Sequence, residues 1–550
     1  MIKQIAGAVI GMLFLFPNSN TYCQSTYARV YTILQTHCAD AGCHGVSPYE
    51  SFSLAGSQND VYNQIVNGAV ANPVASQKSH VLISPGYPHR SFLLRKIASD
   101  MGNELVLETG EGTPCPKNGV LTAVEKELVR QWIMFGAPKS GTVISEATLI
   151  DYYSGKALPE IDAPPPPPPG EGFQVHDGPL FLLPGQEREY QWKYNTLLPE
   201  DVEVTKVEVV MSPQSHHYIL YKYHPGYGSN VAEGHQRITS VAGQADVQIN
   251  ASTIATWQYS RPHELPEGTA YFWEASTILN SNFHIKNYDD DSILAAHAYL
   301  NVYTRPRGSG AVEMFSRLAV YGGLLNPFAL HIPNTGANHT LSFEQTANET
   351  WYIWILQAHT HKLGVDYDIY LRNADGSRGV KIYEGTMDYE AGFDRGYYDW
   401  AHPPVREFAP LLEVDMREGL IHEATYFNDG PSDVGFGITT NDEMFITYMH
   451  YTKALPVTGI PSAGEPVALQ VKPNPSEGWA VLEYALQEAD RVNIELIHMD
   501  GRQETLLHAA YQTPGRHFLT LNQDGRLIPG LYWIKLTGGK HASTVKVVIQ

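Results

Sequence analysis

Residues 351–361 combine two patterns that restrict how the surrounding chain can fold. Residues 351–355 are two tryptophans, a tyrosine and two isoleucines, a composition that predicts a β-strand. His359 and His361 follow it, two positions apart. Because alternate residues of a strand point to the same face, both imidazoles can reach one metal ion while Ala358 and Thr360 face away. The stretch predicts a β-rich domain with a metal site at a strand end.

The composition sets the scale of the molecule. The chain has 550 residues, too many for one hydrophobic core, so several domains are expected. Hydrophobic residues make up 43% and aromatic residues 11%, which is typical of folded domains and not of disordered ones. The net charge of −21 argues against nucleic acid and anionic membranes as partners.

The N-terminus carries an export signal. Lys3 precedes an apolar run over residues 5–16, and a polar segment follows. This order predicts a secretory signal peptide over residues 1–23, and the run is too short to span a membrane. A lipid anchor on Cys23 is disfavoured, because Tyr22 stands where a small residue is wanted. The mature protein is expected to be secreted or held at the cell surface.

Cys38, Cys43 and His44 form a stretched version of the haem attachment motif, with four residues between the cysteines in place of two. In that motif two thiols add to the haem vinyl groups and the histidine binds the iron. From the spacing alone, a disulfide between Cys38 and Cys43 beside an incidental histidine is an equal alternative.

The order of motifs over residues 24–142 resembles that of the cytochrome-c-like domains of multidomain secreted bacterial proteins. The resemblance implies a c-type haem held by the Cys38-Cys43-His44 motif. In that family a methionine before the last helix is the distal iron ligand, whereas this chain has Cys115 in that position. Three arrangements stay open: Cys115 as ligand, Met101 as ligand, or a five-coordinate iron. The last helix is expected to begin at Thr122, with Glu125 completing its N-terminal cap.

The rest of the chain is predicted to be mainly β. Six prolines at 164–169 indicate a stiff polyproline II spacer. Strand-like segments and turn signals then recur to residue 456, which predicts two tandem antiparallel β-sandwiches. Motifs at 471–478, 530–536 and 545–549 resemble the C-terminal sorting domain of the type IX secretion system of Bacteroidetes, which implies export across the outer membrane. The expected segments are a signal peptide (1–23), a small α-helical cytochrome-c-like domain (24–142), a linker (143–170), two sandwiches (171–325 and 326–456) and a small Ig-like sorting domain (457–550).

Four features of the central region, in this order and at these separations, resemble the type II, ascorbate-dependent copper monooxygenases. That family includes peptidylglycine α-hydroxylating monooxygenase and dopamine β-monooxygenase. The resemblance covers nearly all of residues 171–456. The features are His216-His217, then His284 in Asn-Phe-His, then His359-Thr360-His361, then Met444 with Tyr448.

The resemblance implies two copper ions with different ligand sets. His216, His217 and His284 would hold an electron-transfer copper. His359, His361 and Met444 would hold the copper that binds O2. Apart from the resemblance, Met449 and His450 lie close to Met444 in the sequence and are alternative ligands. The two ions would share no ligand, with a solvent cleft between the sandwiches.

His216 and His217 are adjacent in the sequence, which restricts how they can bind one metal ion. Adjacent residues of a regular strand point to opposite faces. His216 and His217 can therefore bind one ion only at a β-bulge or a strand end.

The substrate-binding positions differ from those of the peptide enzyme. That enzyme anchors a substrate carboxylate with an arginine, an asparagine and a tyrosine, and the corresponding positions here are Gln357, Ile446 and Tyr448. A neutral amide cannot replace a bidentate guanidinium, so a glycine-extended peptide is not expected as the substrate.

The expected function is that of an exported copper monooxygenase that hydroxylates a C–H bond with O2. Its haem would pass electrons to copper. The expected partners are a small-molecule or peptide substrate, O2, an electron donor and the type IX secretion machinery. The alternative is a non-enzymatic cell-surface copper and haem protein for electron transfer or ligand binding.

Overall fold

The computed structural model of the chain describes residues 24–40, 43–45, 52–323, 326–437, 439–456, 469–476, 478–486, 489–498, 502–522, 526–537 and 542–550. The predicted signal peptide lies outside these residues. The chain divides into two compact units, each described here by itself. The first unit contains residues 1–157, 232–236 and 291–293, and the second contains residues 158–231, 237–290 and 294–550.

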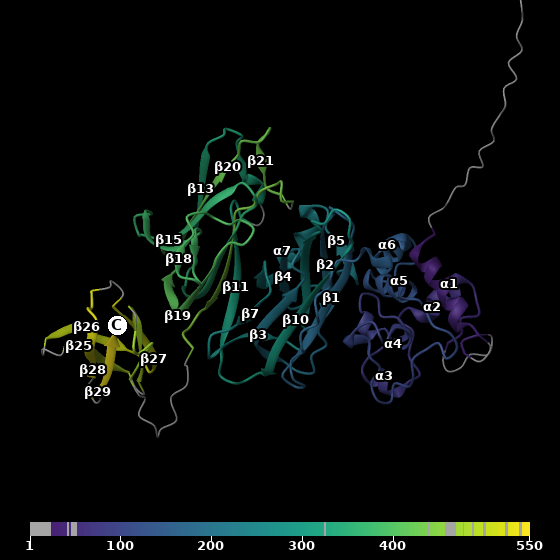
Figure 1. Cartoon of the computed structure of the whole chain (residues 1–550), viewed down its shortest axis with the longest axis horizontal. Coiled ribbons are helices and arrows are strands. Elements are labelled where there is room, and N and C mark those ends of the chain that lie inside the picture. Colours follow the sequence, from purple (N-terminus) through teal and green to yellow (C-terminus); the bar gives the residue numbers. More distant parts are fainter. Residues whose placement is uncertain are drawn as a thin grey trace, which may run out of the picture. The chain divides into compact units, whose positions relative to one another are not determined.

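The named elements of the first unit up to Lys156 are all helical (Figure 1). Thr122 and Glu125 form a capping box at the start of α5, as the sequence predicted. The buried faces of α1 and α5 supply Ile33 and Trp132 to the core of this unit. The elements are α1 (Thr26–Cys38), α2 (Gln58–Ile65), α3 (Pro73–Gln77), η1 (Pro88–Arg90), α4 (Phe92–Ile97), η2 (Asn103–Leu105), α5 (Ala123–Met134), α6 (Glu146–Asp151) and η3 (Tyr152–Lys156).

The predicted linker is structured along most of its length. Helix α6 buries Leu149 completely, and Glu146 accepts hydrogen bonds from Arg29 at 3.0 and 3.1 Å. Further on, the carbonyl oxygens of Pro164 and Pro165 accept hydrogen bonds from side chains of the second unit. Residues 143–156 therefore fold with the first unit, and the start of the proline run is bonded to Gln174 and Asn301 of the second.

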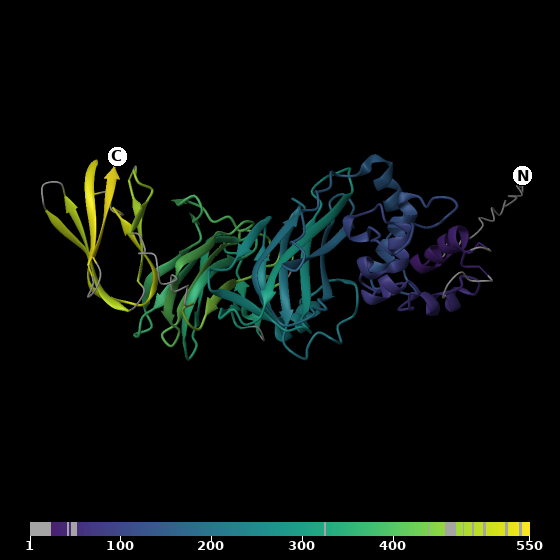
Figure 2. The same ribbon diagram turned by 90° about the horizontal axis from the view of Figure 1, so that it is seen from below.

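Among the described residues, the largest sheet of the second unit has nine strands. Its strands belong to the blue, teal and green part of the ribbon in Figure 2. β11 links its two parts, because it pairs in parallel with β8 over two residues and antiparallel with β22 over seven. The strands in spatial order are β1 (Gly172–Leu182), β10 (Leu294–Pro306), β3 (Val202–Met211), β8 (Thr269–Trp273), β11 (Val312–Val320), β22 (Ile446–Thr452), β14 (Thr350–His359) and β19 (Val405–Asp415), with β7 (Arg261–Glu264) beside β3.

Smaller sheets and a few short elements complete the central region. A five-stranded sheet contains β5 (His235–Arg237), β2 (Glu187–Asn195), β9 (Ile278–Lys286), β4 (Ser215–Tyr223) and β6 (Ala251–Trp257). A four-stranded sheet contains β13 (Asn338–Gln345), β20 (Leu420–Phe427), β15 (Gly364–Arg372) and β16 (Arg378–Glu384). The short elements are η4 (Val241–Gln244), α7 (Ala245–Asn250), η5 (Pro327–Ala329), β12 (His331–Ile332), β17 (Met387–Asp388), β18 (Phe393–Asp394) and β21 (Val434–Gly435).

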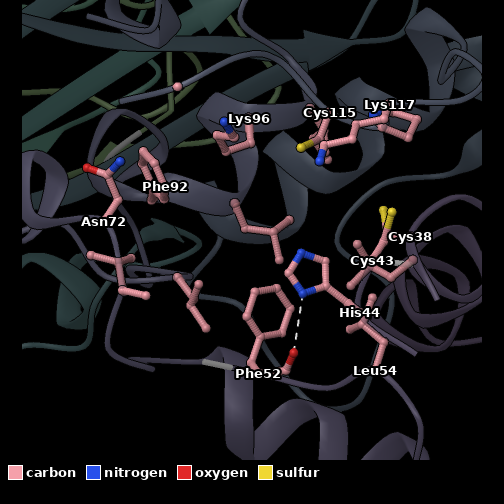
Figure 3. Close-up of a pocket in the computed structure, with 18 of the residues that line it drawn as sticks. Cys38, Cys43, His44, Phe52, Leu54, Asn72, Phe92, Lys96, Cys115 and Lys117 are labelled. Carbon is pink, nitrogen blue, oxygen red and sulfur yellow. Dashed lines mark hydrogen bonds between the residues drawn. The ribbon is translucent and has the colours of Figure 1, made fainter. Parts of the chain in front are cut away.

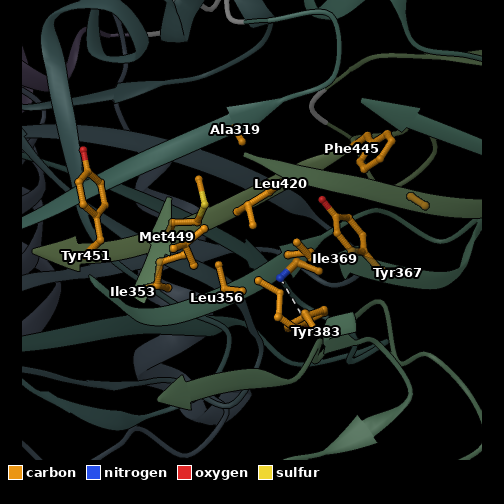
Figure 4. Packing of buried hydrophobic residues seen from close by; sticks show 14 of the residues in the cluster. Ala319, Ile353, Leu356, Tyr367, Ile369, Tyr383, Leu420, Phe445, Met449 and Tyr451 are labelled. Carbon is orange, nitrogen blue, oxygen red and sulfur yellow. Dashed lines mark hydrogen bonds between the residues drawn. The ribbon is translucent and has the colours of Figure 1, made fainter. Parts of the chain in front are cut away.

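Strand β22 has two buried faces with different partners. Its odd-numbered residues Met449 and Tyr451 belong to the core between the nine-stranded and four-stranded sheets, together with Ile353 and Leu420 (Figure 4). Its even-numbered residues face the other way, and Tyr448 joins a separate cluster with residues of β4. Strand β22 thus contributes side chains to two different cores, because successive side chains alternate between its faces.

The C-terminal segment forms its own β core. Leu482, Ile494 and Ile534 are among its fully buried residues. Its strands are β23 (Gln470–Lys472), β24 (Ala480–Leu486), β25 (Asp490–His498), β26 (Gln503–Gln512), β27 (Gly515–Leu521), β28 (Gly530–Thr537) and β29 (Ala542–Ile549).

Strands contain 45% of the residues and helices 15%, so the prediction of a mainly β chain is confirmed. The identity and exact limits of the six predicted segments stay predictions. Among the helices of the described residues, none is both long and apolar enough to cross a membrane.

Buried His422 should make the second unit sensitive to acid. Burial lowers the pKa of His422 from the ordinary 6.5 to about 3. The unfolded chain therefore binds a proton below pH 6.5 that the folded chain does not bind until about pH 3, and stability falls as pH falls through this window. Between pH 6.5 and 5 the loss is about 2 kcal/mol from this group.

We expect His422→Gln to lose less thermal stability than the wild-type protein between pH 7 and pH 5. Differential scanning fluorimetry at the two pH values measures the change. His331→Gln is the matched control, because its side chain is 64% exposed. Equal losses in wild type and His422→Gln would contradict the assignment.

Candidate metal centre and haem cavity

His216 occupies a β-bulge. Strand β4 pairs with β9, and the register shifts between Ser215 and His217, so His216 is the additional residue. The bulge allows adjacent side chains to approach each other, and the Nδ1 atoms of His216 and His217 lie 3.2 Å apart. The β-bulge that His216 and His217 need in order to bind one ion is therefore present.

His284 completes a group of three imidazoles. It lies opposite His217 on β9, and its ring centroid is 4.9 Å from that of His216 and 5.0 Å from that of His217. One ring nitrogen from each histidine lies within 4.8 Å of the others. Two nitrogens bound to one tetrahedral ion are about 3.3 Å apart, which matches the separation of the Nδ1 atoms of His216 and His217.

Hydrogen bonds orient two of these rings. Nε2 of His217 lies 2.9 Å from Oδ1 of Asn282, and Asn282 in turn donates to Glu189 at 2.8 Å. Nε2 of His284 lies 2.8 Å from a carboxylate oxygen of Glu187. These contacts occupy Nε2, so Nδ1 is the nitrogen that each ring would offer to an ion. Partners of this kind fix the tautomer and orientation of metal-binding histidines.

A second bulge orients His359. The register of β14 shifts between Ile353 and Ile355 against both of its neighbours. After the bulge, Leu356 and Ala358 point into the core shown in Figure 4, and His359 points to the opposite face. His361 lies just beyond the end of β14, with its ring centroid 5.3 Å from that of His359. The pair predicted from the sequence is brought together.

Glu443 holds the segment of His361 against that of Met444. Its buried carboxylate accepts hydrogen bonds from the backbone N–H groups of His361 at 2.8 Å, Leu363 at 2.7 Å and Met444 at 3.1 Å. Burial raises the pKa of Glu443 to about 7, although the three N–H donors oppose the rise. Nδ1 of His361 lies 3.1 Å from the carbonyl oxygen of Asp442, so Nε2 is the nitrogen that His361 would offer to an ion.

Met444 and Tyr448 lie near His359 in different ways. The ring of Tyr448 is buried, with its centroid 6.4 Å from that of His359. Met444 packs against an apolar cluster that includes Tyr448 and Ile446. Its role as a metal ligand stays a prediction.

The two histidine groups lie against each other. The ring centroids of His216 and His361 are 6.4 Å apart, and those of His217 and His359 are 6.3 Å apart. His284, His359 and His361 are at most 5% exposed. This arrangement differs from the two sites across a solvent cleft that the family resemblance implies.

Burial favours the neutral form of four of these imidazoles. Burial lowers the pKa of His216 to about 3 and that of His361 to about 4, and it holds the pKa of His217 and His359 well below the ordinary value. Neutral imidazole is the form that binds metal ions. Nε2 of His216 is buried without a hydrogen-bond partner among the described residues.

Other candidate residues belong to different surroundings. Met449 is fully buried in the core of Figure 4, and His450 lies 2.9 Å from the hydroxyl of Tyr271. Neither therefore substitutes for a ligand. Gln357, which stands where the peptide enzyme has arginine, donates to Gln258 at 2.8 Å.

Sequence reasoning missed the supporting residues. Glu187 and Glu189 lie on β2, and β2 gave no sequence signal linking it to the histidines. Trp400 was missed as well; its ring centroid lies 6.1 Å from that of His216. Asn282 was visible in the sequence as part of the Asn-Phe-His motif.

The first unit contains a cavity around the stretched haem motif (Figure 3). The volume of this cavity that the centres of water molecules can occupy is about 280 Å³. Cys38, Cys43 and His44 line it, and both cysteines are free thiols. Nδ1 of His44 lies 3.2 Å from the carbonyl oxygen of Phe52, and the two rings stack at 4.0 Å. The structure thus brings Cys38, Cys43 and His44 together at one cavity, and their attachment to a haem stays a prediction.

Cys115 lines this cavity, and Met101 is not among its lining residues. Figure 3 shows the Cys115 sulfur on the side of the cavity near Lys96, away from the sulfurs of Cys38 and Cys43. Burial raises the pKa of Cys38 to about 12, with Cys115 and Cys43 as nearby charges that add to the rise. Of the two residues that the sequence offered as distal ligands, only Cys115 lines this cavity, and the choice among Cys115, Met101 and a five-coordinate iron stays a prediction.

Comparisons with known proteins add no family. No family model matches the chain, and no curated protein matches it. Among solved structures, the chain is similar to the major capsid protein P2 of bacteriophage PM2, with 9% identity and a TM-score of 0.23 over 52% of this chain and all of that one. It is also similar to PNGF-II, with 9% identity and a TM-score of 0.19 over 51% of this chain and 60% of that one. Scores this low carry no argument about function.

If Cys115 is the distal ligand, Cys115→Ala should change the optical and electron paramagnetic resonance spectra of the haem-loaded protein, because it would remove a sulfur ligand from the iron. Met101→Leu is the matched control and should leave both spectra unchanged. Spectra that respond to Met101→Leu, or to neither variant, would contradict Cys115 as the distal ligand.

Proposed function

We propose that the chain is an exported copper-dependent monooxygenase that uses O2 to hydroxylate a C–H bond. The observation that carries this proposal is the cluster of five imidazoles, four of them buried, arranged as a group of three and a group of two. Imidazole suits copper in both of its oxidation states.

His216, His217 and His284 would hold one copper, and His359 and His361, with Met444, would hold the other. A thioether ligand such as Met444 favours Cu(I), the state that meets O2. When bound, copper supplies O2 activation and one-electron chemistry, while the protein fixes ligand geometry.

The chain's own residues perform three tasks in this proposal. Asn282 and Glu187 orient the imidazoles of His217 and His284. Glu443 keeps the His361 segment in place through backbone N–H groups. Tyr448, buried beside His359, and the shell of apolar residues around it exclude water from the reacting group.

The pair Gln357 and Gln258 limits the substrate. The two amides bond each other at 2.8 Å and are both buried, so this position offers no cation to a carboxylate. We infer a substrate without a carboxylate at this position, either a neutral small molecule or an internal peptide segment.

The remaining segments fit an exported, self-contained redox enzyme. A c-type haem on Cys38, Cys43 and His44 would supply electrons one at a time. Two tandem β-sandwiches would form the copper-binding core. The C-terminal segment would direct export through the type IX secretion machinery, to the cell surface or the medium.

A second candidate is a surface protein that binds copper and haem without catalysis. One observation favours it: Met444 packs in an apolar cluster, so the O2-binding ligand set is less complete than the group of three. Turnover with O2 distinguishes the two candidates.

The copper content of the purified protein tests the proposal. We expect about two coppers per chain, lost in the double variant His216→Ala/His359→Ala, together with ascorbate-dependent O2 uptake. His402→Ala is the control, because its side chain is 58% exposed. Two bound coppers without O2 uptake would favour the second candidate, and absence of stoichiometric copper would contradict copper binding itself. In a single turnover, haem oxidation after O2 addition is the expected sign that haem supplies electrons.

A further inference from the structure

We propose that the five histidines build one two-metal centre, in which two transition-metal ions lie side by side and interact magnetically. The family resemblance implies two isolated ions, so this proposal departs from it. It rests on the proposed function only for the identity of the metal as copper.

The distances between rings assign the imidazoles to two ions. Two imidazoles bound to one tetrahedral ion have centroids about 5 Å apart. The group of three has separations of 4.9, 5.0 and 5.4 Å, and the pair His359 and His361 has 5.3 Å. Each group therefore matches one ion.

Two independent contacts then bring the groups together. His216 faces His361 at 6.4 Å, and His217 faces His359 at 6.3 Å. Four rings thus form a closed four-sided arrangement with sides of 5.3 to 6.4 Å. An ion held by one group lies about 3 Å from the rings of that group, so each ion is a near neighbour of the other group's rings.

An apolar cluster holds the two groups of histidines at this distance from each other. Strand β4 carries His216 and His217, and its residues Ile219 and Tyr221 pack against Ile446 of β22. Ile446 is in turn the register partner of His359 on β14. These side chains are at most 6% exposed, and the burial of their apolar surface stabilises the fold. Separating the two groups would expose this cluster to water, so the short distances are a packed arrangement of the fold.

Buried carboxylates provide the charge that two cations require. Glu189 is 7% exposed, and its nearest ionisable partner is His217, at 3.9 Å. Within the described part of the chain, no lysine or arginine forms an ion pair with it. The buried Glu443 bonds to the His361 backbone, and the partly exposed Glu187 bonds to His284. A buried acid without a cationic partner is costly, and cations among the five imidazoles would supply the missing charge.

Electron paramagnetic resonance of the copper(II)-loaded full-length protein tests the proposal. Two nearby copper(II) spins give a half-field transition split by both copper nuclei, and its intensity falls steeply with distance. We expect this signal in the doubly loaded wild-type protein. We expect it to weaken when zinc occupies half of the sites, because fewer centres then hold copper at both positions; this control needs no mutation.

Single variants provide the second control. His284→Gln and His361→Gln should each lose the half-field signal and keep an ordinary single-copper spectrum, and His402→Gln should keep the half-field signal. Two bound coppers with independent spectra and no half-field transition would overturn the two-metal centre while leaving the proposed function intact. One ion bound per chain would also overturn it. Failure to bind copper at all would overturn both proposals.

Discussion

The packing of β4 against β22 is the interaction on which the metal centre depends. Ile219 and Tyr221 on one strand and Ile446 and Tyr448 on the other form a buried apolar contact between two sheets. His216 and His217 lie at the start of β4, and His359 lies at the end of β14, which pairs with β22. The packing therefore sets the distance between the two ligand groups. The bulge at His216 then turns two adjacent imidazoles toward one point. Without either feature the same residues would face different directions.

The sequence was informative wherever the chemistry is local. The spacing of His359 and His361 and the requirement for a bulge at His216 follow from strand geometry, and the structure has both arrangements. The capping box at Thr122 is equally local. The mainly β character followed from composition and from alternating apolar residues.

The sequence was uninformative wherever the result depends on contacts between distant strands. The register of β22 against β14 decides that Tyr448 lies beside His359 and that His450 bonds Tyr271 instead. No local pattern encodes that register, so the sequence could not exclude His450 as a ligand. The support from Glu187 and Glu189 was hidden for the same reason. The adjacency of the two histidine groups also depends on sheet packing, which the resemblance to a family with separated sites did not suggest.

Everything proposed for this protein depends on the binding of metal ions among the five histidines. Diffraction from copper-soaked crystals at two wavelengths, above and below the copper absorption edge, tests it most directly. We expect two anomalous peaks. One should lie among His216, His217 and His284, and the other beside His359 and His361. Peaks only at other groups, such as the carboxylates of Asp366, Asp368 and Glu384, would contradict it.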